Sequence, residues 1–564
     1  MESGPKGPLS FCAVGKDNEP MSAQSEKQRA LAAIKAQRFG EAASLLATVL
    51  KREPGDTQSR WLRLNCLDQL GDRENGQQEL DELLYRSAPD VGQVNALAEF
   101  ARQRGYSLGA VAAALKACDD QHPGDAGIAY NLAWYQAASG DAPAAVKAYE
   151  RALELGVQGA EEVHLNLANL YMDQLDQPAR ARLHLDKALT LRPDYPGALH
   201  NLGNLEEREG NREAAQRCFK RCLELDPADD RALARLADAH VFSQPGEPLL
   251  ERLTAIAPQS QNPDLHYARG RALDQVGEYD AAWAALSRAN TLDRAGLPAY
   301  RPAQTEDMAV KVIEGFSRDW LDRFPRVETH RPVFLCGMFR SGTTLLERML
   351  AAHPAFAAGG ESEFFPRLVR DEWPGWPEGV DTITPEQVAD WAQRHARWLE
   401  ERSEPGLRLT DKRPDNFLYV GLIKAVVPGA RFVVTERDWR DVLVSVFATR
   451  LGAGQAYAAD PADIRHYLGL HRQLVDHWEG VLGNALLRVA YEDLVSDPRA
   501  TLGRVLEHLG EPWDDACLAF HEQQGAVATA SVWQVREPLH TRSVGRWKNY
   551  AGPLRDALGA GAID

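Results

Sequence analysis

A helical pattern that returns at intervals of close to 34 residues constrains the fold of the first half of this 564-residue chain. Each unit has two amphipathic stretches joined by a polar turn, and the best-matched units end at Pro193 and Pro227. One position of a helix in each unit carries a small residue. A larger apolar residue stands four residues after it, and a third apolar residue stands seven residues after it. In that order, the three sets are Ala42, Ala145, Ala181, Ala215 and Ala282; Leu46, Tyr149, Leu185, Phe219 and Leu286; and Val49, Ala152, Ala188, Cys222 and Ala289. Because small residues let helices approach and larger ones fill the space between hairpins, the pattern predicts stacked helical hairpins.

Glycines near the turns complete this pattern, since a residue that tolerates positive φ is favoured there. They are Gly71, Gly140, Gly210 and Gly277. The whole pattern resembles the tetratricopeptide repeat, with about eight units between residues 23 and 300 and degenerate units near 90–125 and 230–260. The resemblance implies an all-α solenoid whose concave groove holds a peptide or protein. A purely structural role, or homodimerisation through the array, remains the alternative.

The second half of the chain has the pattern of an α/β domain. After an expected linker at 301–328, strand-like segments occur at Pro332–Cys336, Arg431–Thr435 and Leu486–Val489, and helical stretches separate them. Strands that alternate with helices predict a mainly parallel sheet. Such sheets bind their ligands at the carboxyl ends of the strands.

The loop after the first strand has the glycine spacing of a phosphate-binding P-loop. Gly337 and Gly342 match G-x-x-x-x-G-K-[ST], but Thr343 stands at the Lys position. Backbone N–H groups at the following helix can still hold an anion, with Arg340 as a further donor. A P-loop-like nucleotide kinase is kept as an alternative, although the missing Lys counts against it.

Six segments together resemble the sulfotransferases that use 3′-phosphoadenosine 5′-phosphosulfate (PAPS), most closely the tyrosylprotein type. They are FRSGTTLLERMLAAHP, GGESEFFPRL, TDKRPDNF, ERDWRDVLVSVF, VAYEDLVSDPR and SVWQVREPLHTRSVGRWKNY. The resemblance covers roughly residues 329–555 and leaves 556–564 as a C-terminal tail. It implies a P-loop-like sulfotransferase fold and PAPS as co-substrate, with no metal required. The acceptor, a protein tyrosine or another hydroxyl, stays open.

The resemblance also implies the roles of individual residues. Glu361 would be the general base, while Lys412 and Arg340 would stabilise charge near the bridging and sulfuryl oxygens. Glu363 remains an alternative base, because Ser362 interrupts the acidic pair of the family motif. The donor-binding set is Arg340, Ser341, Gly342, Thr343, Thr344, Leu345, Arg437, Ser445, Tyr491, Ser531 and Arg546. The Trp-rich stretch 373–398 could wall the acceptor site or be a packed insertion.

Composition excludes some classes of function and favours one compartment. The chain has 64 basic and 81 acidic residues, a net charge of −17, which argues against general binding of nucleic acid or anionic membranes. Seven scattered cysteines suit a reducing compartment. Residues 1–22, rich in Gly, Pro and Ser, are expected to be disordered, and no apolar signal or membrane span is evident. We therefore expect a cytoplasmic enzyme, with a non-catalytic repeat scaffold as a further alternative.

Overall fold

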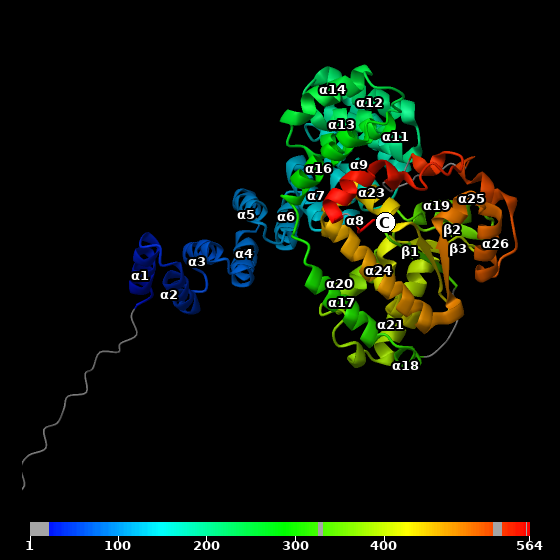
Figure 1. The fold of residues 1–564 in the computed structure, drawn as a ribbon. Helices are drawn as coiled ribbons and strands as arrows, with labels where there is room; N and C mark the ends of the chain where they lie inside the picture. Colours follow the sequence, from blue (N-terminus) through cyan, green and yellow to red (C-terminus); the bar gives the residue numbers. More distant parts are fainter. Residues whose placement is uncertain (1–21, 89, 325–330, 523–532, 560, 564) are drawn as a thin grey trace, which may run out of the picture. The chain divides into compact units, whose positions relative to one another are not determined.

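The computed structural model describes residues 22–88, 90–324, 331–522, 533–559 and 561–563 (Figure 1). The packing forms two compact units, Met1–Ala198 and Leu199–Asp564. Apart from Ser22, the segment predicted to be disordered, 1–22, lies outside the described residues.

The first unit consists of consecutive helical hairpins. Its helices are α1 (Ala23–Lys35), α2 (Phe39–Arg52), α3 (Thr57–Leu70), α4 (Arg73–Ser87), α5 (Val91–Arg104), α6 (Gly109–Gln121), α7 (Ala126–Ala138), α8 (Ala142–Glu154), α9 (Ala160–Asp173) and α10 (Pro178–Leu191). The hairpins continue in α11 (Pro196–Glu209), α12 (Arg212–Leu225), α13 (Asp230–Asp238), α14 (Pro248–Ile256), α15 (Pro263–Gln275) and α16 (Tyr279–Arg294). Helices α1 to α16 thus make eight consecutive pairs among the described residues.

The packing of these hairpins follows the periodic pattern of the sequence. Every residue of the three recurring sets is at most 1% exposed. The four turn glycines all have positive φ, between 71° and 89°. The prediction of stacked helical repeats is therefore confirmed residue by residue.

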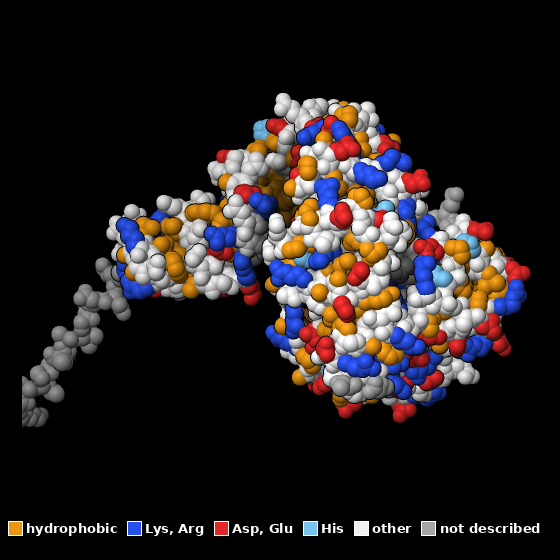
Figure 2. Space-filling model, turned by 45° about the horizontal axis from the view of Figure 1, so that its top comes forward, with side chains coloured by type: hydrophobic (Ala, Val, Ile, Leu, Met, Phe, Trp, Pro, Cys, Tyr) orange, Lys and Arg blue, Asp and Glu red, His pale blue; other side chains and the backbone are white. Residues whose placement is uncertain are grey.

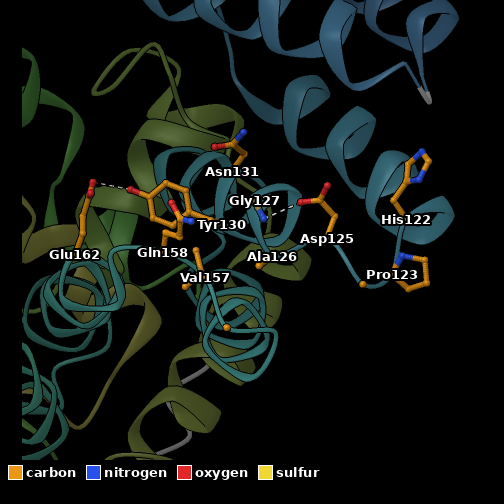
Figure 3. A pocket seen from close by; sticks show the side chains of 12 residues that line it. His122, Pro123, Asp125, Ala126, Gly127, Tyr130, Asn131, Val157, Gln158 and Glu162 are labelled. Carbon is orange, nitrogen blue, oxygen red and sulfur yellow. Dashed lines mark hydrogen bonds between the residues drawn. The ribbon is translucent and has the colours of Figure 1, made fainter. Parts of the chain in front are cut away.

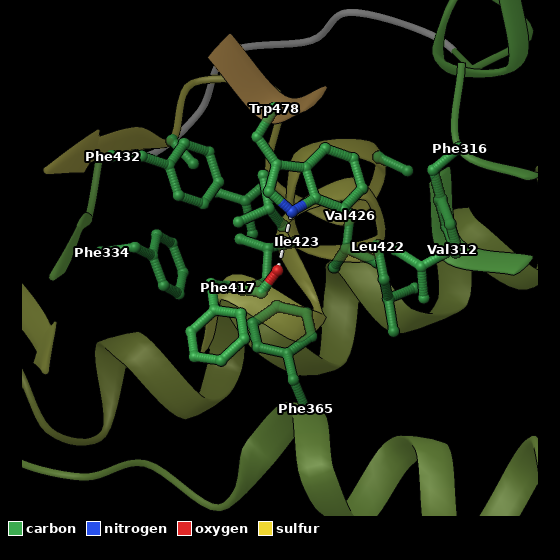
Figure 4. Packing of buried hydrophobic residues seen from close by; sticks show 14 of the residues in the cluster. Val312, Phe316, Phe334, Phe365, Phe417, Leu422, Ile423, Val426, Phe432 and Trp478 are labelled. Carbon is green, nitrogen blue, oxygen red and sulfur yellow. Dashed lines mark hydrogen bonds between the residues drawn. The ribbon is translucent and has the colours of Figure 1, made fainter. Parts of the chain in front are cut away.

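The segment predicted as a linker, 301–328, contains two helices, α17 (Pro302–Gly315) and α18 (Arg318–Leu321). Val312 and Phe316 are buried, and they join the same hydrophobic cluster as Phe334 and Trp478 (Figure 4). The spacing of Ala309, Val312 and Phe316 puts their side chains on one helical face, which explains why the segment packs against the α/β core. Residues 325–330 of this expected linker lie outside the described ranges.

The α/β part is built on a five-stranded parallel sheet with strand order β2-β3-β1-β4-β5. Its strands are β1 (Val333–Gly337), β2 (Phe356–Ala358), β3 (Arg408–Lys412), β4 (Arg431–Glu436) and β5 (Leu486–Ala490). Its helices are α19 (Thr343–Ala351), α20 (Phe364–Glu372), α21 (Pro385–Glu400), α22 (Val420–Val426), α23 (Trp439–Phe447), α24 (Pro461–Leu482), α25 (Tyr491–Ser496), α26 (Pro498–Leu509) and α27 (Ala551–Leu558). The three strands predicted from the sequence are present, and β2 and β3 are additional.

Two hydrophobic clusters cover the two faces of this sheet. Alternate residues of β1 point to opposite faces, so that Phe334 joins one cluster and Leu335 the other. The first cluster includes Trp373 and Trp391 of the Trp-rich stretch, both buried, which favours the packed-insertion alternative for these two residues. The second cluster includes Leu346 of α19 and so fixes the helix that follows the P-loop-like turn.

The residues predicted as a C-terminal tail, 556–564, are partly built into the fold. Residues 556–558 complete α27, and Ile563 is buried. Arg440 Nη1 donates to the carbonyl oxygen of Ile563 at 3.0 Å. Ala560 and Asp564 lie outside the described residues.

Acidic and basic side chains are interspersed on the molecular face that Figure 2 displays. This mixture of charges agrees with the modest net charge of −17 on 564 residues. Across the described part of the chain, no helix is both long enough and apolar enough to cross a bilayer.

Close packing between α15 and α16 can be tested at Gly270. An added Cβ there would lie 2.6 Å from Leu286 Cδ2, so Gly270→Ala should lower the free energy of unfolding by about 1–3 kcal/mol. A Cβ at Gly469, inside α24, would meet no atom within 4 Å, so Gly469→Ala should be neutral or stabilise by about 0.5–1 kcal/mol. Urea unfolding of both variants measures the difference, and equal stabilities would contradict the close packing.

Candidate active site

The carboxyl ends of all five strands present residues predicted to act in the site. Glu361 follows β2, Lys412 ends β3, Arg340 follows β1, Arg437 follows β4 and Tyr491 follows β5. Since the strands are parallel, these ends share one edge of the sheet, where ligands of open α/β sheets bind.

The loop between β1 and α19 has the backbone of an anion-binding turn. Arg340 has φ of 71° and Gly342 of 106°, so two nearby positions of the loop have positive φ. Such a conformation is unfavourable for arginine and is typical of functional sites. Gly342 precedes α19 without any side-chain cap, and its absent Cβ would lie 2.7 Å from Tyr491 Cδ2. The N-terminus of α19 therefore keeps its backbone donors for an anion.

One cavity collects most of the residues predicted to bind the donor. It is lined by Arg340, Gly342, Thr343, Thr344, Leu345, Arg437, Ser445, Tyr491 and Arg546, together with residues of the segment 535–543. Ser341 does not line it: its hydroxyl donates to Met338 O at 2.7 Å and lies 2.7 Å from Thr435 Oγ1, which ties the loop to β4. The predicted contact of Ser531 falls outside the described residues.

Guanidinium groups crowd around this cavity. Burial lowers the pKa of Arg340 to about 10, and the positive charges of Arg437, Arg546 and Arg271 act in the same direction. Like charges held together in a buried place are relieved by a bound anion. The donor set thus fits a ligand with phosphate or sulfate groups.

Arg437 is held in place mainly by contacts that leave donor capacity. Its Nη1 donates to Arg340 O at 3.3 Å, and its guanidinium carbon lies 4.6 Å from the ring centre of Tyr491. Its Nε is buried and has no hydrogen-bond partner within the described structure. Next to it, Arg340 Nε donates to Ser445 Oγ at 3.0 Å, which brings Arg340, Arg437 and Ser445 into one group.

The segment that carries Arg546 is fixed to the sheet by Asp441, a residue of α23. Its carboxylate accepts from Gly545 N at 2.7 Å and from Trp547 N at 2.8 Å. Asp441 is buried and also lies 4.0 Å from Arg437 Nη2. The carboxylate of Asp441 therefore lies between Arg437 and the segment that carries Arg546, and it helps to orient both.

Asp274, at the end of repeat helix α15, fixes Arg546 itself. Arg546 Nη2 donates to Asp274 Oδ2 at 2.6 Å, and the hydroxyl of Tyr550 donates to the other oxygen. Burial lowers the pKa of Arg546, but the charge and hydrogen bond of Asp274, together with Tyr550, more than offset this, so that the pKa of Arg546 is raised overall. A residue of the repeats therefore helps to build the cavity.

A lysine–glutamate pair lies at the β2–β3 side of the same edge. Lys412 Nζ donates to Glu361 Oε1 at 2.6 Å, with Lys412 fully buried and Glu361 39% exposed. Glu363 pairs instead with Arg413 and is 51% exposed. A half-exposed carboxylate beside a buried ammonium group suits proton transfer to and from a ligand better than a carboxylate in a surface ion pair.

Three carboxylates of this region were missed by the sequence reasoning: Asp274, Asp441 and Glu347. Asp441 stands four residues after Arg437 at the start of a helix, a spacing that could have marked it. Glu347 interrupts the apolar run of the loop helix, and this was a second usable signal. No sequence signal marked Asp274, because its partner Arg546 lies 272 residues away.

Residues 332–515 match the sulfotransferase family, and residues 27–91, 130–196 and 196–239 match tetratricopeptide repeats. The chain combines tetratricopeptide repeats with a sulfotransferase domain. An uncharacterized protein of Aquifex aeolicus is 27% identical over 374 residues, 64% of this chain and 49% of that protein. The protein-tyrosine sulfotransferase A of Caenorhabditis elegans is 29% identical over 203 residues, 34% of this chain and 52% of that protein.

The chain spans about half the length of these curated relatives. Among solved structures, the sulfotransferase domain of the Synechococcus PCC 7002 olefin synthase is similar, with 22% identity and a TM-score of 0.31. The similarity covers 40% of this chain and 90% of that domain.

The tetratricopeptide repeats of the first unit contain a separate hollow of about 860 Å³ (Figure 3). It lies beside α7 and the turns that precede α7 and α9, and polar side chains such as Tyr130, Asn131 and Glu162 line it. Tyr130 donates its hydroxyl to Glu162 Oε1 at 2.7 Å. This polar hollow is a second candidate for ligand contact, remote in sequence from the sulfotransferase domain.

Replacing Asp274 tests whether the repeats orient the cavity of the sulfotransferase domain. Asp274→Ala removes the partner of Arg546, and we expect adenosine 3′,5′-bisphosphate to bind roughly three- to tenfold more weakly, which corresponds to about 1 kcal/mol. Asp280→Ala, at an exposed position of the neighbouring helix, is the matched control and should bind as the wild type does. Isothermal titration calorimetry gives both constants. Unchanged binding in Asp274→Ala would show that its contact is structural only.

Proposed function

We propose that this protein is a sulfotransferase that moves a sulfuryl group from PAPS to a hydroxyl acceptor. The supporting observation is the placement of a half-buried arginine cluster and a Lys412–Glu361 pair along one edge of the sheet. The first group suits a polyanionic nucleotide, and the second suits removal of a hydroxyl proton. The family match of residues 332–515 supports the same reaction class.

The cavity residues divide into two groups for the donor. The N-terminus of α19 and the side chains of Thr343, Thr344 and Arg340 would hold the 5′-phosphosulfate. Arg437 and Ser445 would hold the 3′-phosphate, for which the buried Nε of Arg437 is a ready donor. When bound, PAPS supplies the sulfuryl group.

The transfer step uses the lysine–glutamate pair. Glu361 would accept the proton of the acceptor hydroxyl, so that this oxygen becomes nucleophilic. Lys412 and Arg340 would stabilise the negative charge that develops on the bridging and sulfuryl oxygens. Because Lys412 is fully buried, its charge acts with little screening by water.

The acceptor that we favour is a hydroxyl of a peptide or protein, tyrosine included, held by the tetratricopeptide repeats. Repeat proteins of this kind generally mediate protein interactions, and the hollow beside α7 offers polar and aromatic contacts. Glu162 and Asp125 at this hollow would repel a strongly acidic peptide. We therefore favour an acceptor without a dense acidic cluster, encountered in the cytoplasm.

Glu361→Gln should abolish sulfuryl transfer while adenosine 3′,5′-bisphosphate still binds within a few-fold of the wild type. The reason is that this carboxylate serves the acceptor proton and the nucleotide contacts lie elsewhere. Glu363→Gln is the matched control and should stay active, because that residue only pairs with Arg413. Transfer is measured as an 80-Da mass increase of peptide or phenol acceptors. An active Glu361→Gln with an inactive Glu363→Gln would move the base to Glu363.

Arg437→Ala should weaken adenosine 3′,5′-bisphosphate binding by about 10- to 150-fold, the effect of roughly 1.5–3 kcal/mol for a charge-assisted hydrogen bond. The loss should be much smaller for adenosine 5′-monophosphate, which lacks the 3′-phosphate. Arg472→Ala removes an arginine that is 80% exposed on α24 and should change neither constant. Equal losses for both nucleotides in Arg437→Ala would assign this arginine a structural role.

A further inference from the structure

Glu347 is a buried carboxylate beside the proposed base that the reaction described above leaves unused. It lies in the middle of α19, the helix after the anion-binding loop, and is 5% exposed. Its Oε1 accepts from Thr410 Oγ1 of β3 and from Gly360 N, both at 3.0 Å. A carboxylate in this position is costly to bury unless its charge and its oxygens are matched.

The two hydrogen bonds place Glu347 against the turn that leads to Glu361. Gly360 is held on both sides, because its N–H donates to Glu347 and its carbonyl accepts from Lys412 N at 2.8 Å. The preceding Gly359 has no room for a side chain, since a Cβ there would lie 2.1 Å from Thr410 O. The backbone immediately before Glu361 is thus fixed between α19 and β3.

Glu347 also faces the charge of Lys412. Burial raises the pKa of Glu347 overall, although the charge of Lys412 and the hydrogen bonds from Thr410 and Gly360 act to lower it. The charge of Glu361 acts on Glu347 in the opposite direction to that of Lys412. The buried ammonium group therefore has two carboxylates nearby, and only Glu361 is exposed enough to meet an acceptor.

We propose that Glu347 is a positioning residue that aims Glu361 through the Gly360 amide. This role rests on the proposed function, since it matters only if Glu361 is the base. It predicts that loss of the oxygen acceptors lowers turnover and loosens the turn, and that a variant that keeps an oxygen acceptor retains turnover.

The test compares Glu347→Gln, Glu347→Ala and a charge-loss control, Glu372→Gln. Glu372 binds Trp391 and Arg394 on the surface of the same domain, so its replacement removes a carboxylate and its hydrogen bonds away from the site. Glu347→Ala should lower kcat roughly 10- to 100-fold with the KM for PAPS kept within about threefold, because a misplaced base costs turnover. Glu347→Gln keeps an oxygen acceptor for the Gly360 amide and should retain most of the turnover.

A second readout does not depend on activity. Glu347→Ala should speed hydrogen–deuterium exchange in a peptide that spans residues 356–363, since the Gly360 amide loses its acceptor, whereas Glu372→Gln should leave this exchange unchanged. If a Glu347 variant does not fold, Thr410→Val removes one donor to Glu347 and should still lower kcat a few-fold at constant KM.

Several results would overturn the proposal. Unchanged kcat in Glu347→Ala, or exchange at 356–363 that matches the control, would reduce Glu347 to a packing residue while an active wild type left the proposed function intact. Equal loss of turnover in Glu347→Gln and Glu347→Ala would contradict positioning through the Gly360 amide. If Thr410→Val is used because a Glu347 variant does not fold, unchanged turnover in Thr410→Val would equally reduce Glu347 to a packing residue. A wild-type protein that transfers no sulfuryl group from PAPS to any peptide or phenol would overturn both proposals together.

Discussion

Repulsion between guanidinium groups at one edge of a parallel sheet is the constraint on which the rest of the sulfotransferase domain depends. Arg340, Arg437 and Arg546 line the same cavity, and the pKa of Arg340 is lowered first by burial and then by this proximity. Such a cluster persists only where surrounding groups over-determine its geometry. Asp441 and Asp274 supply fixed negative charges beside it, one from α23 and one from α15.

The sheet topology explains how donor and acceptor chemistry can be separated yet adjacent. Strands β1 and β4 lead into Arg340 and Arg437, and β2 and β3 on the other side of β1 lead into the lysine–glutamate pair. Leu335 of β1 is in register with Lys412 of β3, and Gly337 with Thr435 of β4. The two groups therefore flank the carboxyl end of β1, and ligands of open parallel sheets usually bind at this edge.

Much of this organisation could be predicted from the sequence, and the failures have physical causes. The repeats were predictable because each hairpin packs on its neighbours, so burial repeats with the sequence period. Strands β1, β4 and β5 were predictable as apolar runs. Strand β3 was not, because it ends on Asp411 and Lys412, polar residues whose buried side chains bind partners outside the strand, Asn416 and Glu361.

For the site, too, a residue was predictable where its partners lie close to it in the sequence. Residues within a local motif, such as Arg340 to Leu345 and Arg437 with Ser445, could be located by spacing, because each motif is contiguous or nearly so along the chain. The inward turn of Ser341 could not be predicted, because it depends on Thr435 of a neighbouring strand. The segment that forms α17 and α18 was predicted to be a linker. Its apolar face packs on residues far away in the sequence, so the sequence alone does not show what this face covers.

The contacts of α15 and α16 bear on how such fusions could be recombined. Trp283 stacks on Phe447 at 4.6 Å, and Asn290 Nδ2 donates to Phe447 O at 2.8 Å, two residues beyond the serine of the donor cavity. The last repeats therefore share a core with the transferase. Because the compact unit that holds these contacts begins at Leu199, a chimera that exchanges only the repeats before that point would leave the joint between repeats and α/β sheet in place.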